Sequence, residues 1–84
     1  MVQSKLDSVY RPMIETDGNR SVVITGKCAI DLYSRTEMRI RCGKLTVCVR
    51  GCGLELQSLD EMEISICGLI LEISFLTEEG RHDR

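Results

Sequence analysis

The sequence predicts a small all-β domain of about seven short antiparallel strands, each following its neighbour as a meander. Two observations support this fold. Ile, Leu and Val recur at every second position between residues 21 and 76, with polar side chains between them, as expected for strands with one buried face. Glycines and short polar runs then divide that pattern into segments of strand length. The expected strands are residues 21–25, 28–33, 37–42, 45–50, 54–58, 62–67 and 70–76.

The 84 residues leave room for one domain. Residues 1–20 follow neither a helical nor a strand period, so we expect a flexible N-terminal arm that ends at a turn. Residues 21–76 form the β-meander, and residues 77–84 are a charged tail expected to be disordered. A chain of this length buries only about 60 % of its unfolded surface, so its core is thin.

The central hairpin is the best determined element. Gly43-Lys44 suits a two-residue turn, because glycine readily adopts the positive φ that such turns need. That turn places six apolar residues on one face, in the pairs Cys42 with Leu45, Ile40 with Val47, and Met38 with Val49. The opposite face then pairs Glu37 with Arg50, which are oppositely charged.

Three later turns keep the same face apolar. They are Gly51-Cys52, residues 59–61 and Gly68-Leu69. The expected pairs are Val49 with Leu54, Val47 with Leu56, Leu56 with Ile64, Leu54 with Ile66, Ile66 with Leu71, Ile64 with Ile73, and Met62 with Phe75. A slip of one residue would place charges on this face, so the pattern specifies the register.

Two earlier turns extend the pattern toward the N-terminus. A turn at residues 34–36 places Leu32 opposite Met38 and Ile30 opposite Ile40, with Asp31 opposite Arg39 on the polar face. A turn at Gly26-Lys27 adds Val23 opposite Ile30. A sheet with one apolar face must roll into a small barrel or sandwich, or be covered by another copy. The alternative is a β-solenoid, but two-residue glycine turns favour hairpins.

Charge is unevenly distributed along the chain. Residues 1–50 carry nine Lys/Arg and five Asp/Glu, a net charge of +4, whereas residues 51–84 carry two and eight, a net charge of −6. Chance placement and head-to-tail contact between copies both explain this. Nucleic-acid binding is disfavoured, because acids are interleaved with the few basic residues and no aromatic platform accompanies them. No long apolar run or secretory signal occurs, so we expect a cytoplasmic protein without a membrane span.

The chain offers no catalytic apparatus, so we expect no enzyme. The single histidine, His82, falls in the tail, and no Ser or Cys has a fixed base beside it. The carboxylate pairs Glu61 with Glu63 and Glu78 with Glu79 are interpreted as solvated charge. No loop suits a phosphate, and the cysteine spacing does not suit zinc, so no cofactor and no metal are expected.

Five cysteines cannot all pair within one chain. Cys28 and Cys42 lie opposite each other in the expected register, where the geometry allows a cross-strand disulfide, but two packed thiols are the expected state in a reducing cell. Cys48 and Cys67 point outward and Cys52 lies in a turn. These three thiols are candidates for linking one copy to another.

Two surfaces are candidates for binding. Apolar residues of the outer face gather on the first strands and the last one: Val22, Ile24, Tyr33, Ile70 and Leu76. Such an edge is normally avoided unless something pairs with it, and it is covered by the N-terminal arm, a second copy or a different partner. The second surface is the polar face that bears Arg35, Arg39, Arg41 and Lys44.

Residues 22–75 resemble the YabP/YqfC family of sporulation proteins, with the YqfC branch slightly closer. The matching positions are Ile24 and Gly26; Gly43, Leu45 and Val47; Gly51, Leu54 and Leu56; Ile64 and Gly68; and Ile73 and Phe75. The resemblance implies a protein needed to make a spore, acting in coat assembly or in the mother cell or forespore, without enzymatic activity. We therefore expect a self-associating structural or assembly protein of sporulation. The alternative is a recognition module for a membrane or coat protein.

Overall fold

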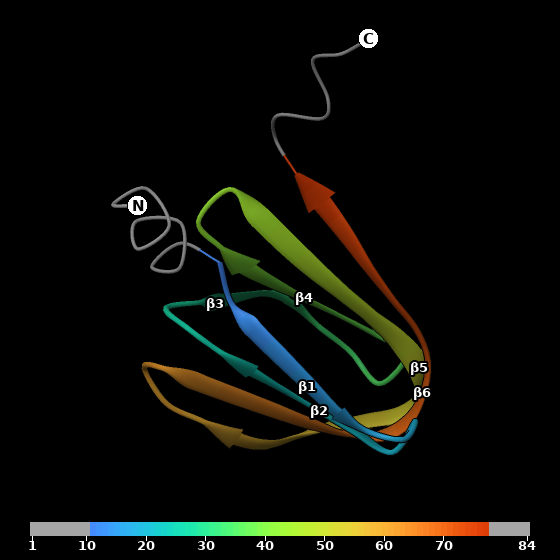
Figure 1. The fold of residues 1–84 in the computed structure, drawn as a ribbon. Helices are drawn as coiled ribbons and strands as arrows, with labels where there is room; N and C mark the ends of the chain where they lie inside the picture. The colour runs from blue at the N-terminus through green and yellow to red at the C-terminus, as the bar shows by residue number, and fades with distance from the viewer. Residues whose placement is uncertain (1–10, 78–84) are drawn as a thin grey trace, which may run out of the picture.

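The computed structural model describes residues 11–77, which form six strands and no helix. The strands are β1 (Met13–Asp17), β2 (Ser21–Thr25), β3 (Ala29–Tyr33), β4 (Glu37–Cys42), β5 (Leu45–Leu59) and β6 (Glu63–Thr77). They form one antiparallel sheet in the order β1-β2-β6-β5-β4-β3 (Figure 1). The all-β prediction is confirmed. The predicted seven-stranded meander is not confirmed, because the described residues form six strands and β2 pairs with the distant β6 rather than with β3. All neighbouring strands are antiparallel, which excludes the parallel stacking of a β-solenoid.

Strands β5 and β6 are long and bent. The sequence predicted reversals at Gly51-Cys52 and Gly68-Leu69, but the chain continues through both in strands of 15 residues, and the register between the strands shifts there. Figure 1 shows the sheet folding over at these bends. The upper half contains β3, β4, residues 45–50 and residues 72–77, and the lower half contains β1, β2, residues 54–59 and residues 63–67. The outermost strands β1 and β3 do not pair with each other, so the sheet stays open.

Close approach of the two strands explains why glycines occupy the bends. Gly51 is buried, and a Cβ there would run into the carbonyl oxygen of Leu69. Gly68 has a φ of 134°, and a Cβ there would lie 2.6 Å from the carbonyl oxygen of Gly53. The glycines therefore permit a bulged crossing of two strands.

The turns of the two short hairpins hydrogen-bond to these bends. Gly51 and Leu54 donate their backbone N–H groups to the carbonyls of Thr36 and Arg35, in the turn between β3 and β4. In the same way, Gly68 and Ile70 donate to the carbonyls of Arg20 and Asn19, in the turn between β1 and β2. Each hairpin thus supports the bend of one long strand.

The predicted register holds in the central hairpin. Gly43 has a φ of 67°, and all of the pairs from Glu37 with Arg50 to Cys42 with Leu45 are observed. Ile30 lies opposite Ile40 as predicted. A bulge at Asp31 then shifts the pairing, so that Tyr33 rather than Leu32 lies opposite Met38.

Four other parts of the prediction are wrong. Val47 and Val49 lie opposite Phe75 and Ile73, because β6 rather than a folded-back β5 covers that side of β5. Leu56 lies opposite Ile66 and Leu59 opposite Ile64, after bulges in β5. Gly26 does not close a hairpin with Ile30; its N–H donates to the carbonyl of Met62, and the chain passes from the lower to the upper half. Residues 13–17 of the predicted arm form β1, whereas residues 1–10 lie outside the described residues.

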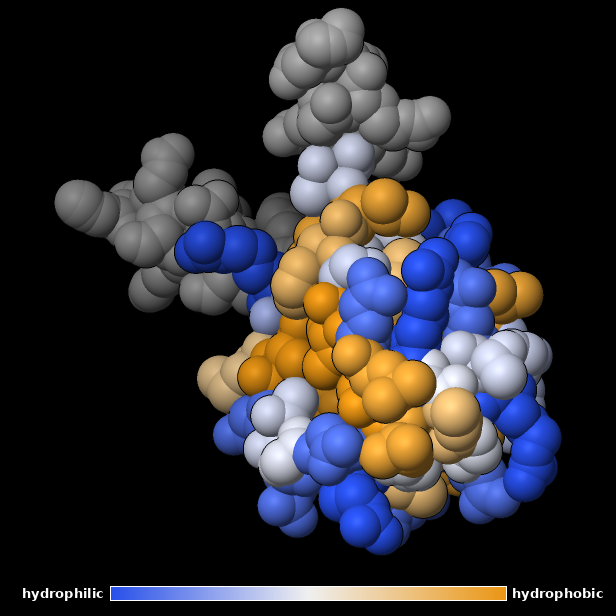
Figure 2. Space-filling model, turned by 90° about the vertical axis from the view of Figure 1, so that its right-hand side faces the viewer, coloured by the Kyte–Doolittle hydropathy of each residue, from blue (hydrophilic) through white to orange (hydrophobic). Residues whose placement is uncertain are grey.

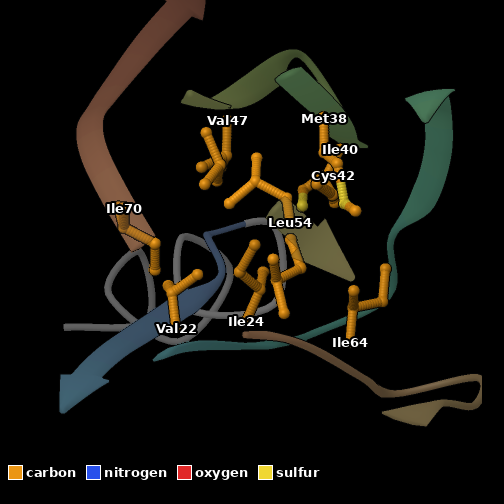
Figure 3. Packing of buried hydrophobic residues seen from close by; sticks show 11 residues of the cluster. Val22, Ile24, Met38, Ile40, Cys42, Val47, Leu54, Ile64 and Ile70 are labelled. Atoms are coloured by element: carbon orange, nitrogen blue, oxygen red, sulfur yellow. The ribbon is translucent and has the colours of Figure 1, made fainter. Parts of the chain in front are cut away.

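The core lies between the two halves of the sheet (Figure 3). It contains Val22, Ile24, Met38, Ile40, Cys42, Val47, Val49, Leu54, Ile64, Ile66 and Ile70. The prediction that Val22, Ile24 and Ile70 point outward is wrong. Because β2 lies in the lower half and pairs with both β1 and β6, its buried face is set by those neighbours rather than by β3. Residues 11–77 contain no helix able to cross a membrane.

Candidate association surface

The described residues hold no cluster of three His, Cys, Asp or Glu side chains that could bind a metal ion. Glu61 and Glu63 are exposed near the turn between β5 and β6. His82, Glu78 and Glu79 lie outside the described residues. The expectations about catalysis at these three positions therefore stay predictions.

The predicted polar face carries five ion pairs, four of them within the upper half of the sheet. Arg39 lies 2.9 Å from Glu37, which is also 3.8 Å from Arg50. The remaining pairs are Arg41 with Asp31 at 3.5 Å, Arg50 with Glu72 at 3.6 Å, and Arg35 with Glu55 at 3.3 Å. The hydrogen bond and charge of Glu37 raise the pKa of the Arg39 guanidinium. Arg35, Arg39 and Arg41 are thus balanced by carboxylates of the same chain, and Lys44 is exposed in the turn after β4.

The cysteines divide into one pair and three thiols. Cys28 and Cys42 form a disulfide with a Cα–Cα distance of 4.3 Å, rather than the two packed thiols expected in a reducing cell. It connects the segment before β3 to the end of β4. Of the three thiols, Cys52 is exposed at the bend of β5 and Cys67 is half-buried, whereas Cys48 lies on the polar face beside Arg39 but is buried there. Cys48 is therefore a poor candidate for linking two copies.

Two residues of the predicted apolar edge remain on the surface. Tyr33 on the outermost strand β3 has 58 % of its surface exposed, and Leu76 near the end of β6 has 55 %. Val22, Ile24 and Ile70 are buried in the core and leave the candidate surface.

Three of the exposed apolar residues that the sequence missed lie on β6, and the others are Met13, Leu32, Leu59 and Met62. Leu71 is 66 % exposed and Phe75 is 52 % exposed, and Leu69 at the bend is also exposed. Figure 2 shows a group of apolar side chains, with polar ones between them, on the face of the molecule that it presents. The pattern assigned Phe75 to the buried face. The signal that could have identified it is its place at the end of β6, because no later strand among residues 11–77 covers it.

Residues 71–76, here called the β6 edge, have a strand partner on one side only. Pairing between β6 and β2 ends at Cys67, and Ile70 makes the last backbone bond to the β1–β2 turn. Beyond that point the described residues pair β6 with β5 alone. The β6 edge therefore combines exposed apolar side chains with backbone groups that no other strand satisfies.

Comparisons with protein-family models, with curated proteins and with solved structures found no match. The fold defines the class: a small all-β domain with one open antiparallel sheet.

Proposed function

We propose that this chain is a non-enzymatic structural or assembly protein of endospore formation, which associates with itself through the edges of its sheet. The observation that carries the self-association is the β6 edge, where an unpaired strand side coincides with Leu71, Phe75 and Leu76 on the surface. An edge of this kind is a template for pairing with another strand.

The sporulation part of the proposal is supported by the resemblance to the YabP/YqfC family. The glycines of this chain on which the resemblance rests lie where other residues fit poorly. Gly26 and Gly43 have positive φ values of 146° and 67°, and Gly51 and Gly68 lie in the crowded bends of β5 and β6. The proposed location is the cytoplasm of the sporulating cell, in the mother cell or forespore, or on the spore itself. The proposed partners are other copies of the chain and other sporulation proteins, and the function needs no cofactor.

A recognition module that binds through its arginines is less well supported. Arg35, Arg39 and Arg41 already pair with carboxylates of the same chain, so a partner would have to displace those contacts. The apolar β6 edge has no such internal partner among the described residues.

The test is the dependence of oligomeric state on concentration. Sedimentation equilibrium of the full chain carrying Cys52→Ser and Cys67→Ser excludes dimers held only by disulfides. We expect reversible dimers or larger oligomers to increase between micromolar and millimolar protein. A chain that stays monomeric throughout that range contradicts the proposal.

A further inference from the structure

Four stretches of strand have a free side in the described part of the sheet: β1, β3, the second half of β5 and the β6 edge. Two copies that pair like edges do so around a two-fold axis, which makes the strands antiparallel and sets the central residue opposite itself. The charges of each strand decide which edge tolerates this arrangement, because like charges directly opposite each other are destabilising.

Three of these stretches oppose self-pairing. In β1, the central residue Glu15 would face its own copy, and in β3 the bulged Asp31 would do the same. The second half of β5 is interrupted by two register shifts, which spoil a regular edge. Central acidic side chains and bulges are the devices that protect sheet edges from pairing.

The regular part of the β6 edge, from Glu72 to Leu76, lacks such protection. Glu72 pairs with Arg50 and Ile70 pairs with Gly51, so Leu71 is the extra residue of a bulge and the regular strand resumes at Glu72. The centre of the regular stretch from Glu72 to Leu76 is Ser74, which is small and uncharged.

We propose that two copies of the chain pair antiparallel along the β6 edge, with Ser74 at the two-fold axis. In this register, Ile73 of each copy lies opposite Phe75 of the other, and Glu72 lies opposite Leu76. Pairs of an aromatic and a β-branched residue stabilise antiparallel sheets, and no two like charges meet. Glu72 is already balanced by Arg50 of its own copy, at 3.6 Å.

The pairing makes the upper halves of the two sheets continuous. The free backbone groups of residues 72–76 gain strand partners, and Phe75 and Leu76, each about half exposed, lose water-accessible surface. This inference rests on the proposed self-association and names its partner, strand and register.

The register is tested with two substitutions at one exposed position. In the dimer, Leu76 faces Glu72 of the second copy, so Leu76→Glu brings two carboxylates together and Leu76→Lys creates an attractive pair, twice in each dimer. Using the full chain with Cys52→Ser and Cys67→Ser, we expect Leu76→Glu to raise the dimer dissociation constant about tenfold. The matched Leu76→Lys variant should stay within about threefold of the parent. Equal weakening by both substitutions overturns the register.

Cross-linking tests the edge itself. Ser74→Cys, with Cys48→Ala added because Cys48 lies beside Ser74 within one copy, places two thiols opposite each other about 5 Å apart at Cα. We expect mild oxidation to convert this variant to a covalent dimer much faster than the matched edge controls Glu15→Cys and Asp31→Cys. Oligomers in which Ser74→Cys cross-links no faster than the controls overturn this inference but leave the proposed self-association standing. A chain that is monomeric at every concentration overturns both.

Discussion

Gly51 and Gly53 lie two residues apart in the bend of β5, but a side chain would meet different surroundings at each. Gly51 is packed against the backbone of Leu69 and Ile70, whereas nothing lies within 4 Å of a Cβ at Gly53, whose φ is 61°. We expect Gly51→Ala to lower the free energy of unfolding by about 2 kcal/mol, because the two bent strands must move apart.

Gly53→Asn is the matched variant, because asparagine tolerates the left-handed conformation and open space surrounds the site. It should cost about 1 kcal/mol or less. Urea unfolding at one fixed protein concentration measures both. Equal midpoints for the two variants would show that β5 and β6 do not approach closely at Gly51.

Single residues also show what a sequence pattern can identify. The turn at Gly43 and the opposite positions of Cys28 and Cys42 were predicted correctly. The role of Gly51 and Gly68 was not, because a glycine that closes a turn and a glycine that permits close approach give the same local signal. Only contact with a strand distant in sequence distinguishes the two roles.

For strand β2, substitutions test which of its two faces is buried. Its sequence places Val22 and Ile24 on one face and Val23 on the other, and the structure buries the first two. Ile24→Ala should therefore lower the free energy of unfolding by about 3 kcal/mol, whereas the half-buried Val23→Ala should cost about 1 kcal/mol. Thermal or urea unfolding of the two variants measures the difference. A larger loss of stability for Val23→Ala would show that Val23, rather than Ile24, faces the core.

The prediction of elements succeeded where partners were close in sequence. The hairpin of β4 and β5 was predicted with its register because its turn is short and both faces of each strand have distinct character. The pairing of β2 with β6 was missed because about 40 residues separate the two strands. An alternating apolar pattern shows which face of a strand is buried but not which strand lies beside it. The same ambiguity hid the β6 edge, since Phe75 and Ile73 had the pattern of buried residues.

On the scale of the whole molecule, the uneven charge allows two modes of association to be distinguished. Contact between a positive and a negative region weakens as salt screens the attraction, because the Debye length falls from about 10 Å at 0.1 M to about 3 Å at 1 M. Pairing along the β6 edge instead brings together apolar side chains. Each copy carries a net charge of −2, so the copies repel each other weakly and salt screens that repulsion.

We therefore expect the dimer dissociation constant to stay constant or fall by up to about threefold between 0.05 and 0.5 M NaCl, because screening acts only on the repulsion between the copies. Sedimentation equilibrium across this range measures the change. The Leu76→Lys variant is the internal control, since its added pairs with Glu72 should make its own association weaken with salt. A dissociation constant of the parent chain that rises tenfold or more would favour head-to-tail charge contact and place the interface away from β6.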